Sequence, residues 1–221
     1  MSDNDLSSIF NNIVKKVSTG AKEAFNEIKT ETTKDINNAK VSIDKELNSE
    51  KYEKKESFTF EKIISSVGEI TAERMQNPME TAALLVNVIA SYTPATEELF
   101  YSMIQKLMGE AQDLTPMLKQ RIKDVLGFGE QWPYLGKSYF NGATYLNDYK
   151  PDEPLTVTVK AGAHSYDEEG YAKLFLHSGG ADSDRAVTFR KMKDGRWVLW
   201  SDTIMGLLPG IRKPESENPW A

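Results

Sequence analysis

The loop that begins at His177 gathers the side chains best suited to bind a ligand. Its nine residues, HSGGADSDR, include an imidazole, two hydroxyls, two glycines, two carboxylates and a guanidinium. Glycine-rich backbone can bind an anion through its N–H groups, and two nearby carboxylates can hold a cation. A tight connection between two strands needs the same glycines and short polar side chains, so an ordinary hairpin loop is the commoner use of such a sequence. The candidate ligand residues are His177, Ser178, Asp182, Asp184 and Arg185.

A second cluster, just before this loop, supplies an imidazole, a hydroxyl and three carboxylates within six residues. A hydrolase or a metal site could use these groups, which are His164, Ser165, Asp167, Glu168 and Glu169. Catalytic groups usually converge from distant segments, however, and this stretch lies between two expected strands, which favours an exposed turn. Neither serine stands in a Gly-x-Ser-x-Gly nucleophile elbow. We therefore predict no catalytic residues, no metal ligands and no cofactor.

Composition excludes several classes of protein. The 221 residues contain no cysteine, which excludes a disulfide framework, thiolate metal sites and a cysteine nucleophile. A net charge of -6 and a pI near 5.2 disfavour a nucleic-acid partner, because phosphate backbones attract a concentrated basic surface. No apolar run is long enough to span a bilayer, and the acidic N-terminus does not fit a secretory signal. The sequence therefore predicts a cytoplasmic protein.

The first fifty residues predict a long amphipathic helical arm. Apolar residues recur mostly every three or four positions between Leu6 and Leu47. At about 1.5 Å per residue, such a face is roughly 60 Å long and cannot bury itself, so it needs a partner helix, a second copy, the chain's own domain or a lipid surface. Residues 1–60 hold ten Lys and eleven Asp or Glu, so attraction to anionic lipid is modest. The expected interaction residues are Phe10, Ile13, Val17, Phe25, Ile28, Ile36, Ile43 and Leu47.

The segment after the arm predicts a linker and then a layer of helices. Residues 51–57 are almost devoid of apolar side chains and indicate the linker. Residues 58–75 resume a helical stripe, the first of the helices expected over residues 58–126. Three later helices begin with an N-cap residue followed by proline, at Asn77-Pro78, Thr93-Pro94 and Thr115-Pro116. The helix after Pro78 is apolar on nearly every face, which places it inside the domain.

From residue 155 the period changes from helical to alternating. Four runs between residues 155 and 201 predict antiparallel strands in a meander, and the Lys193-Asp194-Gly195 stretch between the last two indicates a hairpin turn. Residues 203–221 contain three prolines and predict an extended tail over the surface. The aromatic residues between 127 and 154 would cover the sheet or line a pocket. The expected fold class is α+β, with a long N-terminal amphipathic helix followed by a domain over residues 58–221.

Two segments near the C-terminus, DEEGYAKLFLHSGGADSDRAVTFRKMKDGRWVLW and GIRKPESENPWA, resemble an uncharacterised bacterial domain family, one of the domains of unknown function. The resemblance covers roughly residues 77–221, including NPMETAALLVNVIASY and SYFNGATYLNDYKP, and leaves the arm outside. It implies a boundary between arm and domain and the same fold class. The family has no assigned catalytic residues, so the resemblance implies no activity.

These features together favour a non-catalytic interaction protein. The arm would mediate self-association, as in a coiled coil, or dock a protein partner, and the α+β domain would be the recognition module. The main alternative is a small-ligand binder or hydrolase-like enzyme with a pocket between sheet and helices. That alternative requires His164 or His177 to face a cavity beside an acidic side chain. A third possibility is a peripheral membrane protein attached through the arm.

Overall fold

The computed structural model describes residues 49–127 and 130–219 without a break, and before them residues 33–46, 30, 31, 26, 27, 22, 23 and 19. The chain divides into two compact units, Met1–Ser49 and Glu50–Ala221. Because no placement of one unit against the other follows from this division, each is described by itself.

In the first unit, residues 33–46 form a continuous helix, α1, which is shorter than the helix expected over residues 1–50. Two of the expected interaction residues, Ile36 and Ile43, lie on α1 and are 50% and 56% exposed. On the described part of the arm, these two residues of the apolar stripe are therefore exposed to solvent. The other expected interaction residues lie outside the described residues: Phe10, Ile13, Val17, Phe25, Ile28 and Leu47.

In the second unit, strand β1, Lys54–Phe60, corrects the expected linker at 51–57 and the expected helix from residue 58. It follows a 3-10 turn, η1, at Ser49–Tyr52. Residues 58–75 continue as β1 and two more 3-10 turns, η2 at Val67–Glu69 and η3 at Arg74–Gln76. The helical interpretation was wrong because apolar residues at 58, 60, 63, 64 and 67 fit two periods at once. Pairing with a distant strand decided between them.

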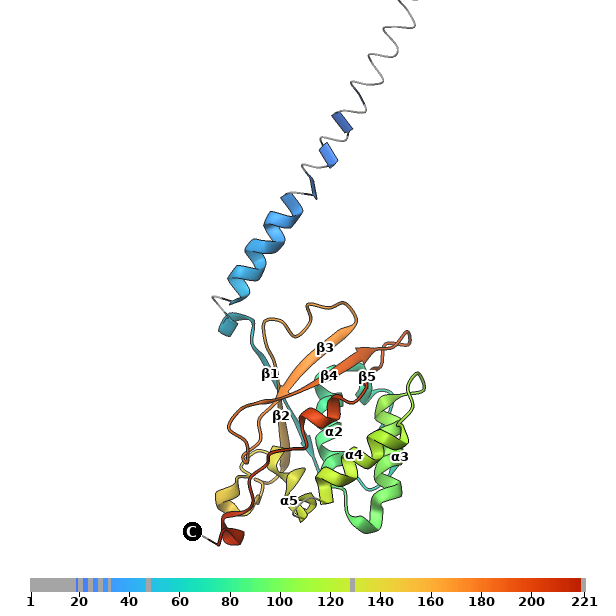
Figure 1. The fold of residues 1–221 in the computed structure, drawn as a ribbon, viewed down its shortest axis with the longest axis vertical. Coiled ribbons are helices and arrows are strands. Elements are labelled where there is room, and N and C mark those ends of the chain that lie inside the picture. The colour runs from blue at the N-terminus through green and yellow to red at the C-terminus, as the bar shows by residue number, and fades with distance from the viewer. Residues whose placement is uncertain are drawn as a thin grey trace, which may run out of the picture. The chain divides into compact units, whose positions relative to one another are not determined.

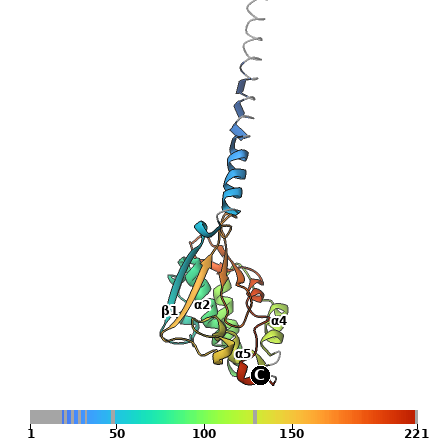
Figure 2. The ribbon, with the colours of Figure 1, turned by 90° about the vertical axis from the view of Figure 1, so that its left-hand side faces the viewer.

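The sheet is an antiparallel meander of five strands in the order β1-β2-β3-β4-β5 (Figure 1). The four strands expected between residues 155 and 201 are confirmed, and β1 adds a fifth at the edge beside β2 (Figure 2). Hydroxyl pairs join these two strands on their outer face, with Ser57 Oγ 2.9 Å from Thr158 Oγ1. The later strands are β2 Leu155–Ala161, β3 Tyr171–Leu176, β4 Arg185–Lys191 and β5 Trp197–Leu199.

The expected cap signals do start helices. Asn77 Oδ1 accepts from the Met79 N–H at 2.8 Å, and α2, Pro78–Ala90, follows. Thr93 forms a capping box with Thr96 over a 3-10 turn, and α3, Glu97–Met108, comes next and ends at Gly109. Two further helices are α4 Pro116–Gly127 and α5 Trp132–Leu135.

The core lies between α2 and the sheet, which curls around this helix as a half-barrel. Every residue of α2 from Thr81 to Ile89 is buried, and the inward side chains of β2 are Val157, Val159 and Ala161. The buried Asn87 side chain accepts from the Ile64 N–H at 2.7 Å, which fixes the segment after β1. Buried side chains of α2 and β2 thus fill the space between them.

The C-terminal tail packs into this core, whereas its prolines predicted an extended segment over the surface. It forms short 3-10 turns at Thr203–Gly206 and Glu215–Glu217, and it buries Ile204, Leu207, Leu208 and Ile211. Two tyrosines of the aromatic connection hold it, because Tyr139 Oη donates to the Leu207 carbonyl and Tyr149 Oη to the Arg212 carbonyl. The aromatic connection therefore covers the core and pins the tail.

Candidate functional site

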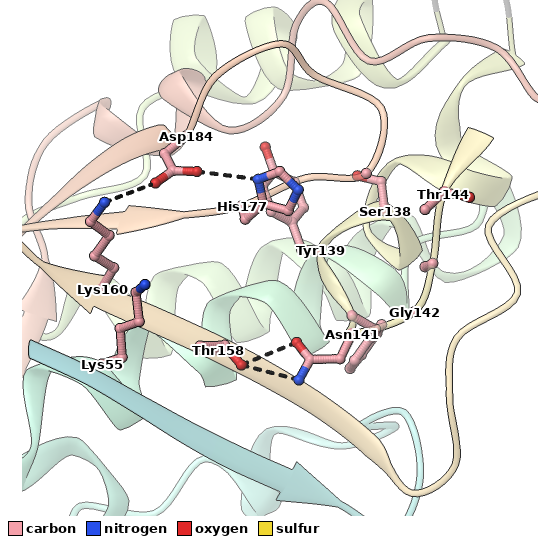
Figure 3. Close-up of a pocket in the computed structure, with 13 residues that line it drawn as sticks. Lys55, Ser138, Tyr139, Asn141, Gly142, Thr144, Thr158, Lys160, His177 and Asp184 are labelled. Carbon is pink, nitrogen blue, oxygen red and sulfur yellow. Dashed lines mark hydrogen bonds and ion pairs between the residues drawn. The ribbon is translucent and has the colours of Figure 1, made fainter. Parts of the chain in front are cut away.

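A cavity opens where strands β2 and β3 separate. The two strands pair only from Val159–Leu176 to Ala161–Leu174. Beyond that point the segment 138–145 enters between them: the Asn141 N–H donates to the Thr156 carbonyl at 2.8 Å, and the Gly179 N–H donates to the Ser138 carbonyl, also at 2.8 Å. The split leaves a cavity of about 510 Å³ (Figure 3).

Close backbone contacts set the shape of this cavity and explain the two glycines of the loop. A Cβ on Gly179 would lie 2.0 Å from the Ala143 carbonyl oxygen, and one on Gly180 would lie 2.1 Å from the Tyr149 hydroxyl. Real side chains do not approach so closely, so only glycine lets the loop lie against segment 138–145 and the core tyrosine. The glycines thus serve packing, and their N–H groups donate to the Ser138 carbonyl and to Ser178 Oγ within the fold.

One wall of the cavity is a row of alternating charges from strands β1, β2 and β4. Glu53 just before β1 accepts from Lys55 Nζ at 2.7 Å and from Lys160 Nζ at 2.9 Å. Lys160 Nζ also lies 3.6 Å from Asp184, whose other oxygen is 3.2 Å from His177 Nδ1. The hydrogen bonds from Lys55 and Lys160 lower the pKa of Glu53, and the one to Glu53 raises the pKa of Lys160. Both side chains are therefore charged at neutral pH.

A second wall, beside the charged row, is neutral and polar. The Asn141 amide and the Thr158 hydroxyl make two reciprocal hydrogen bonds of 3.1 Å (Figure 3). This wall therefore offers an amide and a hydroxyl to a ligand.

The hydroxyls at the floor of the cavity are already engaged. Ser178 Oγ donates to Ser138 Oγ at 2.8 Å, and Ser138 Oγ donates to the Leu135 carbonyl at 2.7 Å. Tyr139 donates to the Leu207 carbonyl, and burial raises the pKa of its phenol. These side chains hold segment 138–145 in place, and each of their hydroxyl groups already donates a hydrogen bond within the fold.

Comparison with protein families matched residues 59–215 to a family described as "Domain of unknown function (DUF6935)". The match covers well over half of the 221 residues. The chain belongs to this family. The DUF6935 match confirms the resemblance to a domain of unknown function, and it begins inside β1, earlier than the expected residue 77. Comparison with curated proteins and with solved structures returned no match.

Only some residues of the expected ligand loop of the DUF6935 domain line the cavity. His177 and Asp184 line the cavity, whereas Ser178 is buried beneath it. Asp182 pairs with Arg212, and Arg185 Nη2 donates to the Gly210 carbonyl at 3.1 Å, so neither reaches the cavity. Among the described residues of the DUF6935 domain, no three His, Asp or Glu side chains gather as a metal site.

Sequence reasoning missed four polar residues that line the cavity of the DUF6935 domain: Lys55, Asn141, Thr158 and Lys160. The aromatic connection, which was expected to cover the sheet or line a pocket, supplies Tyr139 and Phe140 to it. The alternation of Phe58 and Phe60 with hydroxyl residues was the signal that could have placed β1 and its lysine. Nothing local in the sequence indicates that the ladder between β2 and β3 divides.

The earlier cluster in the DUF6935 domain is an exposed turn, as expected. His164 Nδ1 lies 2.6 Å from an Asp167 oxygen, and both side chains are about half exposed. Ser165 accepts from the Gly162 N–H at 2.8 Å and donates to the Lys173 carbonyl, which closes the turn.

Among the described residues, no helix is long and apolar enough to cross a membrane.

Proposed function

We propose that this domain is a non-catalytic binding module that holds a small polar molecule, bearing one carboxylate or phosphate group, in the cavity at the β2–β3 split. The observation that carries the proposal is the convergence of Lys160, His177 and the Asn141–Thr158 pair on one cavity from segments far apart in the sequence. The sequence-based alternative of a ligand binder required a histidine facing a cavity beside an acidic side chain. His177 beside Asp184 meets that requirement.

Distances in the charged wall favour an oxyanion ligand. Lys160 is held tightly by Glu53, at 2.9 Å, but its 3.6 Å contact with Asp184 is longer than a hydrogen bond. A carboxylate or phosphate oxygen can replace that loose contact and form a charge-assisted hydrogen bond with the ammonium. Because Lys55 and Lys160 are balanced by Glu53 and Asp184, a ligand with one anionic group fits better than a polyanion.

The neutral wall favours a ligand with hydrogen-bonding groups of its own. The Asn141 amide and the Thr158 hydroxyl can exchange their mutual bonds for bonds to a donor and an acceptor. The cavity volume of about 510 Å³ lies within the usual range for small-molecule sites, about 300–1,000 Å³. A metabolite-sized molecule with a hydroxyl or amino group beside its oxyanion satisfies both walls.

The committed hydroxyls favour binding over hydrolysis. A serine nucleophile needs a free hydroxyl beside its base, and the Ser138 proton is given to a carbonyl. His177 is held by Asp184 as a general base would be, but its side chain is 74% exposed to solvent. The arrangement therefore suits recognition of an anion by a histidine more than proton transfer in a closed site.

Titration of the full chain with small oxyanions, followed by backbone amide NMR, tests the proposal. The probes are acetate, lactate, glutamate and inorganic phosphate. We expect at least one probe to shift the amide resonances of Asn141, Thr158, His177 and Gly179. Lys160→Met should weaken the binding of that probe about tenfold, or by about 1.4 kcal/mol. Lys62→Met is the control, because Lys62 lies at a similar distance, 3.7 Å, from Glu69 but outside the cavity. The proposal fails if no probe shifts these amides, or if both variants weaken binding equally.

The arm supports a second candidate function, self-association through a helical coiled coil. Ile36 and Ile43 lie on one side of α1 and are exposed, and an apolar helix face gains stability by packing on another. Light scattering on the full chain should give the mass of a dimer or larger, and Ile36→Ser with Ile43→Ser should reduce it to a monomer. Val41, 53% exposed on another side of α1, supplies the control Val41→Ser. A monomeric wild-type chain overturns this candidate.

Attachment of the arm to a membrane and the cytoplasmic location stay predictions from the sequence. Flotation of the full chain with liposomes, with and without anionic lipid, tests the attachment. Absence of the protein from both floated fractions would reject it.

A further inference from the structure

The end of the β4–β5 hairpin carries an arginine stacked on two aromatic rings. The Arg190 guanidinium lies 4.5 Å from the ring centroid of Trp200 and 5.2 Å from that of Tyr171. The two rings meet edge to face, with centroids 5.6 Å apart. Stacking on rings restrains the guanidinium while its N–H donors stay available in its plane. Arg190 is thus held ready for a planar anionic group.

The neighbouring cations of this hairpin have no acidic partners. Within the described ranges, Arg190, Lys191 and Lys193 form no ion pair, and the exposed Glu168 and Glu169 of the preceding turn contact none of them as an ion pair. Asp194 lies between these cations along the chain, but it is engaged by Arg196, at 2.7 Å. A local excess of positive charge therefore stands on a chain whose net charge is -6.

An apolar hollow adjoins these cations. It has a volume of about 520 Å³, and its apolar lining comes from Ala111, Met192, Val198 and Trp200. Met192 is flexible and polarizable, so it can adapt to side chains of different shape. The surface thus combines a place for one apolar side chain with cations around it.

We propose that this surface docks an acidic polypeptide segment, with one apolar side chain in the hollow and flanking carboxylates on Arg190 and Lys193. Charge complementarity selects the occupant. Arg190 and Lys193 line the apolar hollow without an ion pair among the described residues, and Asp194, which also lines it, is held by Arg196. A guanidinium presents a fork that matches a carboxylate with two parallel hydrogen bonds. This docking surface is separate from the cavity at the β2–β3 split and does not depend on the function proposed for it.

A nucleic acid or a membrane fits the same surface less well. Single-stranded nucleic acids bind by stacking bases on open aromatic faces, and the faces of Trp200 and Tyr171 lie under Arg190. A single hollow suits one side chain better than a row of bases or lipid chains.

Fluorescence anisotropy on the full chain with a labelled peptide tests the proposal. The probe is a short peptide with Glu and Asp on both sides of a single Leu, and its control carries Ser in place of Leu. We expect binding that weakens as salt increases and weakens about fivefold or more with the Ser peptide. Arg190→Lys keeps the charge but loses the planar fork, so it should weaken the Leu peptide by a similar factor.

Matched variants separate this surface from general electrostatics and from the cavity. Lys150→Gln removes one exposed positive charge elsewhere and should leave peptide binding unchanged, as should Lys160→Met. An unchanged melting temperature of Arg190→Lys confirms that the fold is intact. The proposal is overturned if the peptide does not bind, if Arg190→Lys binds it as the wild type does, or if an oligothymidylate or phosphatidylserine vesicle binds more tightly through the same residues.

Discussion

The two cationic regions of this domain hold their charges in opposite ways. In the cavity at the β2–β3 split, Lys55 and Lys160 share Glu53, and Lys160 also approaches Asp184. At the end of the β4–β5 hairpin, Arg190 rests on aromatic rings and has no ion pair among the described residues. A cation that already has acidic partners can bind a ligand only by replacing its weakest contact. A cation without an acidic partner attracts an anionic group of another molecule directly. The first region therefore suits a small selective ligand and the second a charged partner.

The same contrast recurs between two arginines of one hairpin. Arg196 is 9% exposed and reaches both Asp194 and Glu110, at 2.7 and 2.9 Å. Arg190 is exposed and contacts rings. Hydrogen bonds between charged groups stabilise the fold when they are shielded from water, and exposed cations contribute little to stability. Arg196 is thus a structural arginine and Arg190 a candidate contact residue.

The largest effect is expected where the cavity depends on backbone contact. Gly179→Val places side-chain atoms against the Ala143 carbonyl, which a Cβ alone would approach to 2.0 Å. We expect a loss of about 3 kcal/mol or more in the free energy of unfolding, measured by urea denaturation. Gly127→Ala is the control, since a Cβ there meets nothing within 4 Å. Equal urea midpoints for the two variants would show that the loop does not need this close approach.

A smaller effect is expected from the structural arginine. Arg196→Met should lower the free energy of unfolding by about 1–2 kcal/mol, because the partly buried guanidinium loses its hydrogen bonds to carboxylates. Arg190→Met, on the same hairpin, should change it by about 0.5 kcal/mol or less. Parallel urea titrations check the difference. The assignment of roles is reversed if Arg190→Met proves the more destabilising.

The pH dependence of this pair carries a definite sign. Hydrogen bonding to Arg196 lowers the pKa of Asp194 and contributes to the lowered pKa of Glu110, below their ordinary values of 3.8 and 4.5. Their contribution to stability is therefore present above those ordinary values and is lost as pH falls through the lowered ones. The wild type should lose more stability than Arg196→Met between about pH 5 and pH 3. Parallel acid-unfolding curves would contradict the pairing.

Changes in the neutral wall of the cavity should affect both stability and ligand binding. Thr158→Val removes the hydroxyl that hydrogen-bonds to Asn141 and Ser57, and should lower the free energy of unfolding by about 1 kcal/mol. It should also weaken the binding of an oxyanion in the cavity. Thr156→Val is the control, because Thr156 bonds Thr59 at 3.2 Å outside the cavity. Denaturation and NMR titration of both variants measure the two effects. Equal losses of binding would place the ligand elsewhere.

The smallest effect belongs to the partly buried Glu53–Lys160 pair of the cavity wall. Glu53 has a lowered pKa and Lys160 a raised one, so their pair stabilises the fold above the ordinary value of 4.5 and up to that of 10.5. The contribution is lost as pH falls below 4.5 or rises above 10.5. Glu53→Gln should flatten the stability profile only at these two ends, and salt should weaken the effect. A change at pH 7 as large as that of Arg196→Met would show that the pair is shielded from solvent.

Local chemistry predicted the elements that depend on it. The cap-and-proline signals at Asn77, Thr93 and Thr115 start the helical segments, since a cap requires only a few adjacent residues. The alternation from residue 155 onward predicted β2 to β5, and the wholly apolar segment after Pro78 predicted the buried α2. The pattern did not assign β1, because its apolar residues fit both periods.

The candidate site could be predicted only in part. His177 and Asp184 were identified from their loop, and the structure places both on the cavity. Lys55 and Lys160 are separated from each other by more than a hundred residues, and only the register of β1 on β2 brings them to one wall. Asn141 reaches Thr158 because segment 138–145 enters the split in the ladder, a contact that no local pattern encodes.

The sequence by itself determined the period of each segment, the starts of the helices, the absence of cysteine chemistry and the family resemblance. Only the tertiary structure decided that β1 is a strand, that the β2–β3 ladder divides into a cavity, and that Arg196 is paired while Arg190 is stacked. The physical reason is the range of the interactions. Caps and periodicity act between neighbours in the chain, whereas strand register, close glycine contacts and ion pairs join residues that only folding brings together.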